Sequence, residues 1–300
     1  MTKTILITGA STGFGRDTAE TLAGAGHRVF AAMRDIAGRN RGHADALHSQ
    51  NIGVVALDVT DDGSVDRAIA SVLKEAGRID VLVNNAGIAS AGVSEAFTPD
   101  QAKLLFNTNV VGVLRTTRAV LPAMRAAGDG LIINIGSVLG RVTFPFFGIY
   151  GASKFAVEAL TDGFRYELSQ LGVDVVLVQP SAYPTNMYAA IQQPADAARA
   201  AAYGATAEIP AKMFATFTEM FSSAGAPDPH DVATAIAALI ERPKGRRPAR
   251  SVVGQPFGAD AVNTATAPVQ QGVSRRSASA ISQRSRSEPW NRSGDHDQAS

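Results

Sequence analysis

Three side chains that could handle a proton lie close together in the sequence. Ser137, Tyr150 and Lys154 all occur in GSVLGRVTFPFFGIYGASKFAVEAL, residues 136–160. Tyr150 and Lys154 are four residues apart at the start of an expected helix, which puts both on one helix face. A phenol has an ordinary pKa of about 10 and is a poor base, but a nearby ammonium stabilises the phenolate and lowers that pKa. The pair is therefore suited to acid–base chemistry at an alcohol or carbonyl oxygen.

The segment around this pair carries a second hydroxyl and several aromatic side chains. Ser137 follows the apolar run GLIINIG, so we expect it at the end of a strand, where it can hydrogen-bond the same oxygen. Phe144, Phe146 and Phe147 lie between the serine and Tyr150. We interpret them as the wall of an apolar pocket; a place in the core or in a dimer contact would explain them equally. The pocket interpretation predicts an apolar ketone or secondary alcohol as substrate.

A glycine-rich turn, TGASTGFG (8–15), follows the first apolar run and opens a helix pattern. Its glycines, Gly9, Gly13 and Gly15, have the spacing G-x3-G-x-G, and Ser11 adds a hydroxyl donor. Such a turn lets the backbone approach a pyrophosphate and points the first helix amides at its charge. The alternative is a plain tight turn with no ligand.

The end of the second apolar run decides which dinucleotide would bind. It reads Met33-Arg34-Asp35. In dinucleotide-binding folds an acidic side chain at this place hydrogen-bonds the ribose hydroxyls, whereas an arginine pairs with a 2′-phosphate. Arg34 favours NADP(H) over NAD(H), and an inward-pointing Asp35 would reverse that preference.

Short apolar runs alternate with longer helical patterns along most of the chain. Continuous apolar strands that alternate with helices predict a parallel sheet covered on both faces. We therefore predict an α/β fold, a three-layer, doubly wound, Rossmann-type parallel sheet in a single domain, with ligands at the carboxyl ends of the strands. The expected strands are 4–8, 27–33, 53–59, 79–84, 130–136, 173–180 and 250–254.

Composition narrows the class of protein. The chain has 300 residues, of which 45% are hydrophobic and 18% charged, and its formal net charge is +1. This balance gives no reason to expect a nucleic-acid or membrane partner. The absence of cysteine excludes disulfides, thiolate catalysis and cysteine metal sites, and it fits a cytoplasmic location. No metal site is predicted.

Two regions depart from the alternating pattern. Residues 181–228 are rich in alanine, methionine and aromatic side chains and show no clear strand. They are either core helices or a mobile substrate lid. Residues 266–300 are rich in serine and arginine and poor in apolar side chains, which predicts a disordered tail after a catalytic domain of residues 1–265.

Taken together, these motifs resemble the short-chain dehydrogenase/reductase (SDR) family. The resemblance covers about residues 3–258, and several of its motifs have not been mentioned above. They are LDVT (57–60), NNAG (84–87), NTNVVG (107–112), YGASK (150–154) and QPSAYPT (179–185). The resemblance implies a Rossmann-type domain that also carries the substrate site.

The resemblance also implies roles for individual residues. Tyr150 would be the catalytic acid/base, Lys154 would hold the nicotinamide ribose, and Ser137 would orient the substrate oxygen. Asn109 would hold a water in a proton relay behind the lysine. The residues expected to bind the cofactor are Gly9, Ser11, Gly13, Phe14, Gly15, Arg34, Asp58, Val59, Asn85, Ala86, Gly87, Tyr150, Lys154, Pro180, Ser181 and Thr185.

The sequence departs from the family pattern at two places. Pro180-Ser181 stands where the family has Pro-Gly, so Ser181 could crowd the loop beside the nicotinamide, although Thr185 is in place for the carboxamide. Thr12 replaces the second basic residue of many NADP-preferring members, whose first arginine aligns with Arg34.

By resemblance we expect a homodimer or homotetramer that pairs the helices containing Asn109 and Tyr150. The function predicted is NADP-dependent hydride transfer between nicotinamide and an apolar ketone or secondary alcohol. The alternative is an NADP-binding regulatory or scaffold protein of the same fold, without turnover.

Overall fold

The computed structural model describes the backbone of residues 1–287 and the side chains of residues 1–273. It contains two compact units, one of residues Met1–Asp260 and a second that begins at Ala261. The sheet and all the residues of the candidate site belong to the first unit. No helix among the described residues is long and apolar enough to cross a bilayer.

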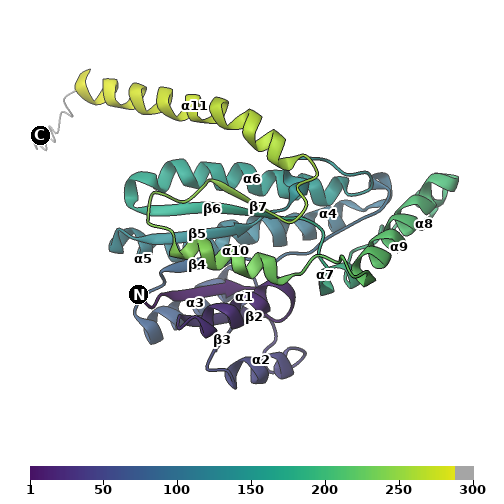
Figure 1. Ribbon diagram of the computed structural model, residues 1–300, viewed down its shortest axis with the longest axis horizontal. Helices are drawn as coiled ribbons and strands as arrows, with labels where there is room; N and C mark the ends of the chain where they lie inside the picture. Colours follow the sequence, from purple (N-terminus) through teal and green to yellow (C-terminus); the bar gives the residue numbers. More distant parts are fainter. Residues whose placement is uncertain (288–300) are drawn as a thin grey trace, which may run out of the picture. The chain divides into compact units, whose positions relative to one another are not determined.

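A parallel sheet of seven strands forms the centre of the first unit (Figure 1), in the order β3-β2-β1-β4-β5-β6-β7. The order changes direction between β1 and β4, as in a doubly wound sheet, and this is where such folds bind ligands. The strand predictions are confirmed, with small changes at the ends. The strands are β1 (Thr4–Thr8), β2 (Arg28–Met33), β3 (Gly53–Ala56), β4 (Val81–Asn84), β5 (Gly130–Ile135), β6 (Val173–Pro180) and β7 (Arg250–Val253).

Helices cover both faces of the sheet, so the predicted three-layer arrangement is confirmed. Successive side chains of β1 point to opposite faces: Ile5 and Ile7 pack in one apolar cluster and Leu6 in the other. The first cluster includes side chains of α1 (Gly13–Gly24), α2 (Arg41–His48) and α10 (His230–Glu241). The second includes side chains of α3 (Asp62–Ala76), α5 (Gly112–Ala127) and α6 (Gly148–Leu168).

One turn of π-helix interrupts an otherwise continuous helical stretch. It spans Asn107–Val111 and lies between α4 (Pro99–Phe106) and α5. A π-turn widens the helix by one residue and is frequent at functional sites. Here it contains Asn109, which is buried.

Buried amides fix the central strands to their helices. The side-chain nitrogen of Asn84, at the end of β4, donates to the Asn134 side chain of β5 at 2.9 Å. Thr116 of α5 donates to Asn84 at 2.6 Å, and Asn134 donates to Thr161 of α6 at 2.9 Å. Because every partner is buried and bonded, this network holds α5 and α6 in one register against the sheet.

A largely buried ion cluster is centred on Glu158 of α6. Glu158 accepts from Arg250 of β7 at 2.7 Å and pairs with Arg141 at 3.2 Å. Arg250 also pairs with Asp162 at 2.6 Å, and Gln179 of β6 donates to Glu158. Burial raises the pKa of Glu158, while the bond to Arg250 and the arginine charges oppose that rise. The cluster joins α6 to β6 and β7 one turn beyond Lys154.

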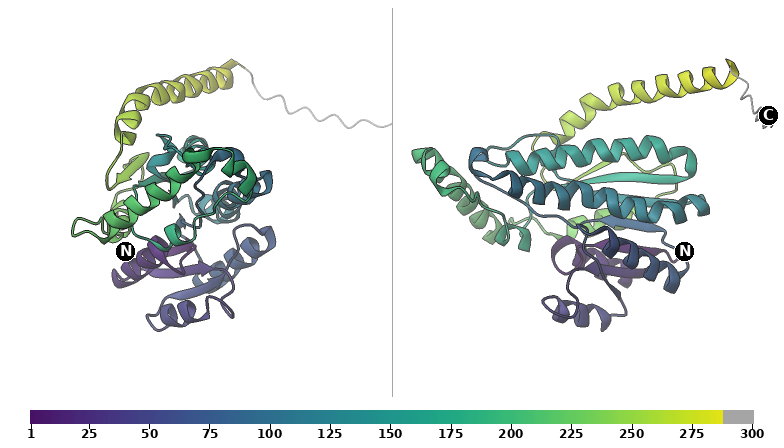
Figure 2. Two further views of the ribbon diagram at one scale, coloured as in Figure 1. Left: turned by 90° about the vertical axis from the view of Figure 1, so that its right-hand side faces the viewer. Right: turned by 180° about the vertical axis from the view of Figure 1, so that it is seen from behind.

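Residues 181–228 form short helices, and most of their side chains are exposed or half-buried. Figure 2 shows α8 and α9 lying beyond one end of the sheet rather than against its face. The expectation of no strand in this region is met, since its regular elements are all helical. They are α7 (Asn186–Ala189), α8 (Ala197–Ala201), a 3-10 turn (Gly204–Glu208) and α9 (Ile209–Ser222).

The predicted disordered tail, residues 266–300, is described in part, and its disorder stays a prediction. The backbone is helical over α11 (Ala259–Ser287), which includes residues 266–287. The prediction rested on scarce apolar side chains, which limit what a segment can bury but do not prevent local backbone hydrogen bonds of a helix. Residues 288–300 lie outside the described residues.

Candidate active site

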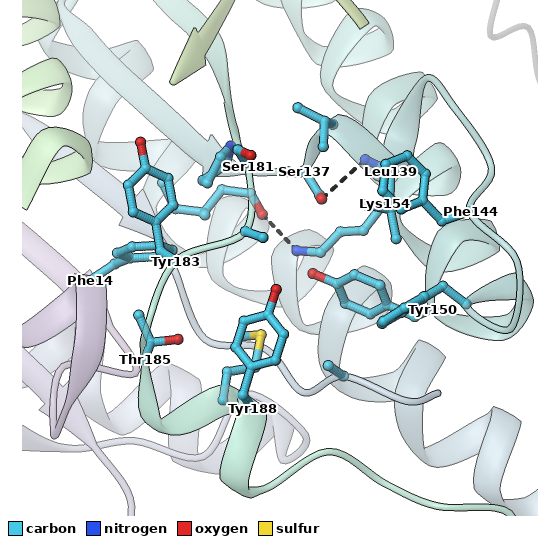
Figure 3. Close-up of a pocket in the computed structure, with 18 of the residues that line it drawn as sticks. Phe14, Ser137, Leu139, Phe144, Tyr150, Lys154, Ser181, Tyr183, Thr185 and Tyr188 are labelled. Carbon is cyan, nitrogen blue, oxygen red and sulfur yellow. Dashed lines mark hydrogen bonds between the residues drawn. The ribbon is translucent and has the colours of Figure 1, made fainter. Parts of the chain in front are cut away.

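The predicted catalytic side chains meet at the carboxyl ends of the central strands. Ser137, Tyr150 and Lys154 line one hollow of about 830 Å³, counted out to its open mouth. Figure 3 shows the hydroxyls of Ser137 and Tyr150 and the ammonium of Lys154 directed toward the same space. Within the described part of the chain, no three His, Asp or Glu side chains gather so as to hold a metal ion.

Tyr150 and Lys154 lie one turn apart at the start of α6, as the spacing predicted. The Lys154 Nζ atom donates to the Ile135 carbonyl at the end of β5, at 2.9 Å, and lies 5.6 Å from the centre of the Tyr150 ring. Burial lowers the pKa of Lys154 to about 8. The ammonium is therefore largely protonated at neutral pH but close to its titration range.

The expected lowering of the Tyr150 pKa is not found in the protein alone. Burial raises the pKa of Tyr150, the nearby Tyr188 raises it further, and only the hydrogen bond with Ser137 lowers it. The reason is that the phenol is buried while the Lys154 ammonium is directed at a backbone carbonyl. Without cofactor, Tyr150 is a neutral hydroxyl, a proton donor rather than a base.

Ser137 follows β5 and is the residue immediately before a 3-10 turn, Val138–Gly140. Its Oγ atom accepts a hydrogen bond from the Leu139 amide at 3.1 Å and thereby caps that turn. This bond fixes the oxygen and leaves its proton free to point toward Tyr150 or a ligand.

Asn109 reaches the site from the π-turn. Its side-chain nitrogen donates to the Ile88 carbonyl at 2.8 Å and to Ser153 Oγ at 3.1 Å, and its oxygen accepts from the Ile88 amide at 2.9 Å. Asn109 thus joins the loop after β4 to α6 at the residue preceding Lys154. Gly87 lies beside it: a Cβ atom there would be 3.3 Å from the Asn109 oxygen.

The glycine turn has the geometry of an anion cradle. Gly9 and Gly13 have φ of +67° and +56°, a region that favours glycine. A Cβ atom at Gly15 would lie 2.6 Å from the Gly9 carbonyl, so only glycine allows helix α1 to start this close. No side chain caps the first turn of α1 and no acidic residue lies in it, so its amides are available to a phosphate.

The loop after β4 is hydrogen-bonded to this glycine turn. The side chain of Asn85 donates to the carbonyls of Thr8 and Gly9, each at 3.0 Å, and the amides of Asn85 and Ala86 donate to the Thr8 hydroxyl. Ser11 and Phe14 are half-buried in the same turn, and Phe14 lines the hollow. The glycine turn, held in this way, fits a bound pyrophosphate.

Two residues at the end of β2, Arg34 and Asp35, were candidates to contact the adenosine ribose, and they differ in their surroundings. Asp35 has φ of +47°, and its carboxylate accepts from the Arg39 amide at 2.9 Å, within its own loop. Arg34 is exposed, and its positive charge lies close enough to Asp58 to lower the pKa of that carboxyl group. Burial raises the pKa of Asp58, but hydrogen bonds from Thr60 and the charge of Arg34 outweigh it, so that the pKa is lowered.

Val59 completes the adenine side of the predicted site. It is buried, and its carbonyl accepts from Arg115 at 3.1 Å. Arg115 also donates to the side chain of Asn107 at 2.8 Å, at the first residue of the π-turn. This arginine, which the sequence did not single out, connects the adenine side to the turn that carries Asn109.

The loop after β6 accommodates serine in place of the family glycine. Ser181 is not among the described residues with positive φ, and its amide donates to the Val253 carbonyl at 3.0 Å. The loop therefore does not need glycine at this position. Pro180, Ser181 and Thr185 all line the hollow, and Thr185 stands at the start of α7.

Aromatic side chains line part of the hollow, but they differ from the expected set. Phe144 and Phe147 line it, whereas Phe146, with φ of +65°, turns its carbonyl to the Gly92 amide at 2.8 Å and does not. Phe257, which sequence reasoning missed, packs edge-to-face on Phe144 at 5.3 Å. Nothing local in the sequence marks Phe257, because it reaches the site only through the loop that follows β7.

Comparison with known proteins identifies the family. Residues 3–196 match the family model described as short chain dehydrogenase, and the chain belongs to this family. A curated relative, 3-ketodihydrosphingosine reductase of Bacteroides thetaiotaomicron, is 42% identical over 184 residues. That match covers 60% of this chain and 64% of the relative, so the chain spans less than two thirds of the relative's length.

Solved structures of similar proteins have the same fold as this chain. A short-chain dehydrogenase from Streptomyces avermitilis is 31% identical, with a TM-score of 0.74 over 97% of this chain and 99% of that chain. A 3-ketoacyl-(acyl-carrier-protein) reductase from Brucella melitensis, complexed with NADH, is 26% identical, with a TM-score of 0.70 over 85% and 98%. Other similar structures hold NADPH or NAD, so the neighbours share a nicotinamide cofactor but not one form of it.

Proposed function

We propose that this protein is an NADP-dependent oxidoreductase that interconverts an apolar ketone and the matching secondary alcohol, with Tyr150 as the acid/base. The observation that carries the proposal is the meeting of Tyr150, Ser137 and Lys154 beside an apolar hollow at the strand ends. Family membership supports it, as do the names of the similar Bacteroides and Brucella proteins, both of which are reductases.

In ketone reduction Tyr150 donates its phenolic proton to the carbonyl oxygen as negative charge develops there. Its raised pKa keeps the proton in place until that charge appears. Ser137 hydrogen-bonds the same oxygen, and the Lys154 ammonium stabilises the phenolate that remains. Asn109 holds the loop and helix around Lys154 in position. A bound nicotinamide cofactor supplies the hydride in this direction and accepts it in the other.

The preference for NADP rests on the two residues at the end of β2. The Asp35 carboxylate is engaged by the Arg39 amide in its own loop, which leaves Arg34 as the side chain able to meet a 2′-phosphate. An Asp35 that turned toward the ribose would favour NAD instead.

The lining of the hollow favours an apolar substrate. Among the described residues that line the hollow, Lys154 is the one charged side chain, and it is bonded to Ile135. A carboxylated or phosphorylated substrate would have no cation of its own to pair with. The name of the Bacteroides relative, a 3-ketodihydrosphingosine reductase, fits an apolar ketone.

We also propose that residues 181–228 act as a lid within a catalytic domain of residues 1–265. Met187, Tyr188, Ile191 and Phe217 come from this region and line the hollow, yet most of the region is exposed. A segment with few buried contacts can open at low cost in free energy.

We propose a homodimer or homotetramer because apolar side chains are exposed on three neighbouring helices of the sequence. Leu104, Leu114 and Phe155 are 50%, 37% and 42% exposed on α4, α5 and α6. Light scattering on the wild type and on Phe155→Asp tests this: the variant should have the lower mass. For a chain without cysteine, we propose the cytoplasm as its location.

The decisive experiment compares NADPH and NADH binding by calorimetry and then follows a panel of ketones at the nicotinamide absorbance. Tighter NADPH binding and turnover that disappears in Tyr150→Phe are the expected results. Cofactor binding with no turnover of any ketone or alcohol in the panel would instead favour the non-catalytic NADP-binding protein. Tighter NADH binding would overturn the role given to Arg34.

A further inference from the structure

A second phenol stands next to Tyr150, and the mechanism above does not use it. Tyr188 comes from α7 and lines the hollow together with Met187 and Phe217 of the same region. Figure 3 shows its hydroxyl pointing toward the space between Tyr150 and Lys154. The two phenols are close enough that Tyr188 raises the pKa of Tyr150.

Aromatic contacts hold the Tyr188 ring in place. The ring packs edge-to-face on Phe221 at 4.9 Å and tilts against Phe217 at 5.8 Å, and these two phenylalanines stack on each other at 6.2 Å. Both belong to α9, so the position of the Tyr188 hydroxyl depends on where α9 lies. An aromatic side chain held this way loses little conformational entropy when a ligand binds.

The hydroxyl itself has no hydrogen-bond partner in the described part of the chain. Burial alone raises its pKa to about 12, so it is neutral and keeps its proton throughout the physiological range. A half-buried hydroxyl that faces a cavity without a partner is costly to leave unsatisfied and becomes a specific contact when a ligand supplies the acceptor.

We propose that Tyr188 binds a second, uncharged polar group of the substrate and so selects ketones that carry an oxygen near the reacting carbonyl. The inference rests on the proposed function, whose reacting oxygen lies at Ser137 and Tyr150. Since the hydroxyl of Tyr188 points toward the space between Tyr150 and Lys154, the second group lies near the carbonyl carbon. A hydroxyl, carbonyl or ester oxygen fits, because a neutral phenol pairs with a neutral acceptor and the wall around it is apolar.

The test is substrate-dependent kinetics of Tyr188→Phe, which keeps the ring and removes only the hydroxyl. The substrates are a medium-chain methyl ketone and the same ketone with a hydroxyl on either of the two next carbons. We expect kcat/KM for the better hydroxyketone to fall roughly tenfold, chiefly through KM, and kcat/KM for the plain ketone to stay within about twofold.

Met187→Leu is the matched control, because it changes a neighbouring apolar side chain of the hollow without removing a hydrogen bond or an aromatic contact of the Tyr188 ring. It should change both substrates by the same factor. If Tyr188→Phe also changes both equally, Tyr188 is only part of the apolar wall and the proposal is wrong.

Binding measurements test the role of Tyr188 independently of whether the protein turns over a ketone. In the presence of NADP⁺, which cannot reduce a ketone, calorimetry measures the affinity of the plain ketone and of the methyl ether of the better hydroxyketone. The ether keeps the acceptor oxygen and cannot be oxidised by NADP⁺, so neither ligand turns over. A preference for the methoxyketone that disappears in Tyr188→Phe supports the role of Tyr188 even if no ketone is turned over with NADPH. Equal affinity of the wild-type protein for both ligands overturns it.

Discussion

The Nζ atom of Lys154 donates a 2.9 Å hydrogen bond to the carbonyl of Ile135, the last residue of β5. This bond ties the helix that carries Tyr150 to the strand that leads into Ser137. It also directs the ammonium at a backbone carbonyl, while burial lowers the pKa of Lys154 and raises the pKa of Tyr150.

The first prediction concerns Tyr150. Tyr150→Phe removes the proton donor and retains the ring, so turnover should fall by roughly a thousandfold. NADPH affinity, measured by calorimetry, should change by about threefold or less, because the variant loses one hydroxyl and keeps every other side chain of the predicted cofactor site. A variant that keeps its rate would assign the acid/base role to another group.

The second prediction concerns Lys154 and pH. Burial lowers its pKa from 10.5 to about 8, so between these values the unfolded chain binds a proton that the folded chain has released. The free energy of unfolding therefore rises with pH through this window, and below it the full cost of burying the charge remains. Urea unfolding should show the wild type gaining stability relative to Lys154→Met from about pH 8 to 10.5. A constant difference between the two proteins would contradict this.

The third prediction concerns the 2′-phosphate. Arg34→Leu should weaken NADPH binding roughly tenfold or more, the worth of a charge-assisted hydrogen bond, and leave NADH binding nearly unchanged. Arg39→Leu is the matched control, since Arg39 is an exposed arginine of the same loop that contacts Asp35 through its backbone amide. Loss of NADPH affinity in the Arg39 variant instead would move the phosphate contact to that residue.

The fourth prediction concerns the ion cluster around Glu158. Arg250→Met leaves Glu158 and Asp162 without their shared partner in a buried place, which should lower the free energy of unfolding by about 3 kcal/mol. Lys212→Met breaks an ion pair with Glu208 whose side chains are 71% and 66% exposed, and should cost less than about 1 kcal/mol. Urea unfolding of both variants without nucleotide measures the difference, and equal losses would mean that the cluster stabilises nothing.

The sequence alone predicted the layered sheet and brought together the candidate catalytic side chains Ser137, Tyr150 and Lys154. Short apolar, β-branched runs such as TILIT and VDVVLVQP predict strands buried on both faces, and parallel strands bring their carboxyl ends to one edge of the sheet. Tyr150 and Lys154 are held together by helix geometry, which acts over four residues. Contacts of that range can be predicted from spacing.

Only the tertiary structure decided the properties that depend on distant segments. Asp35 is turned into its loop by a backbone amide, Phe257 enters the site from the loop after β7, and Tyr188 reaches Tyr150 through α7. The direction of the Tyr150 pKa shift also depended on burial, which many segments create together. Spacing along the chain cannot fix these features, because burial and electrostatics depend on which side chains the fold brings around a group.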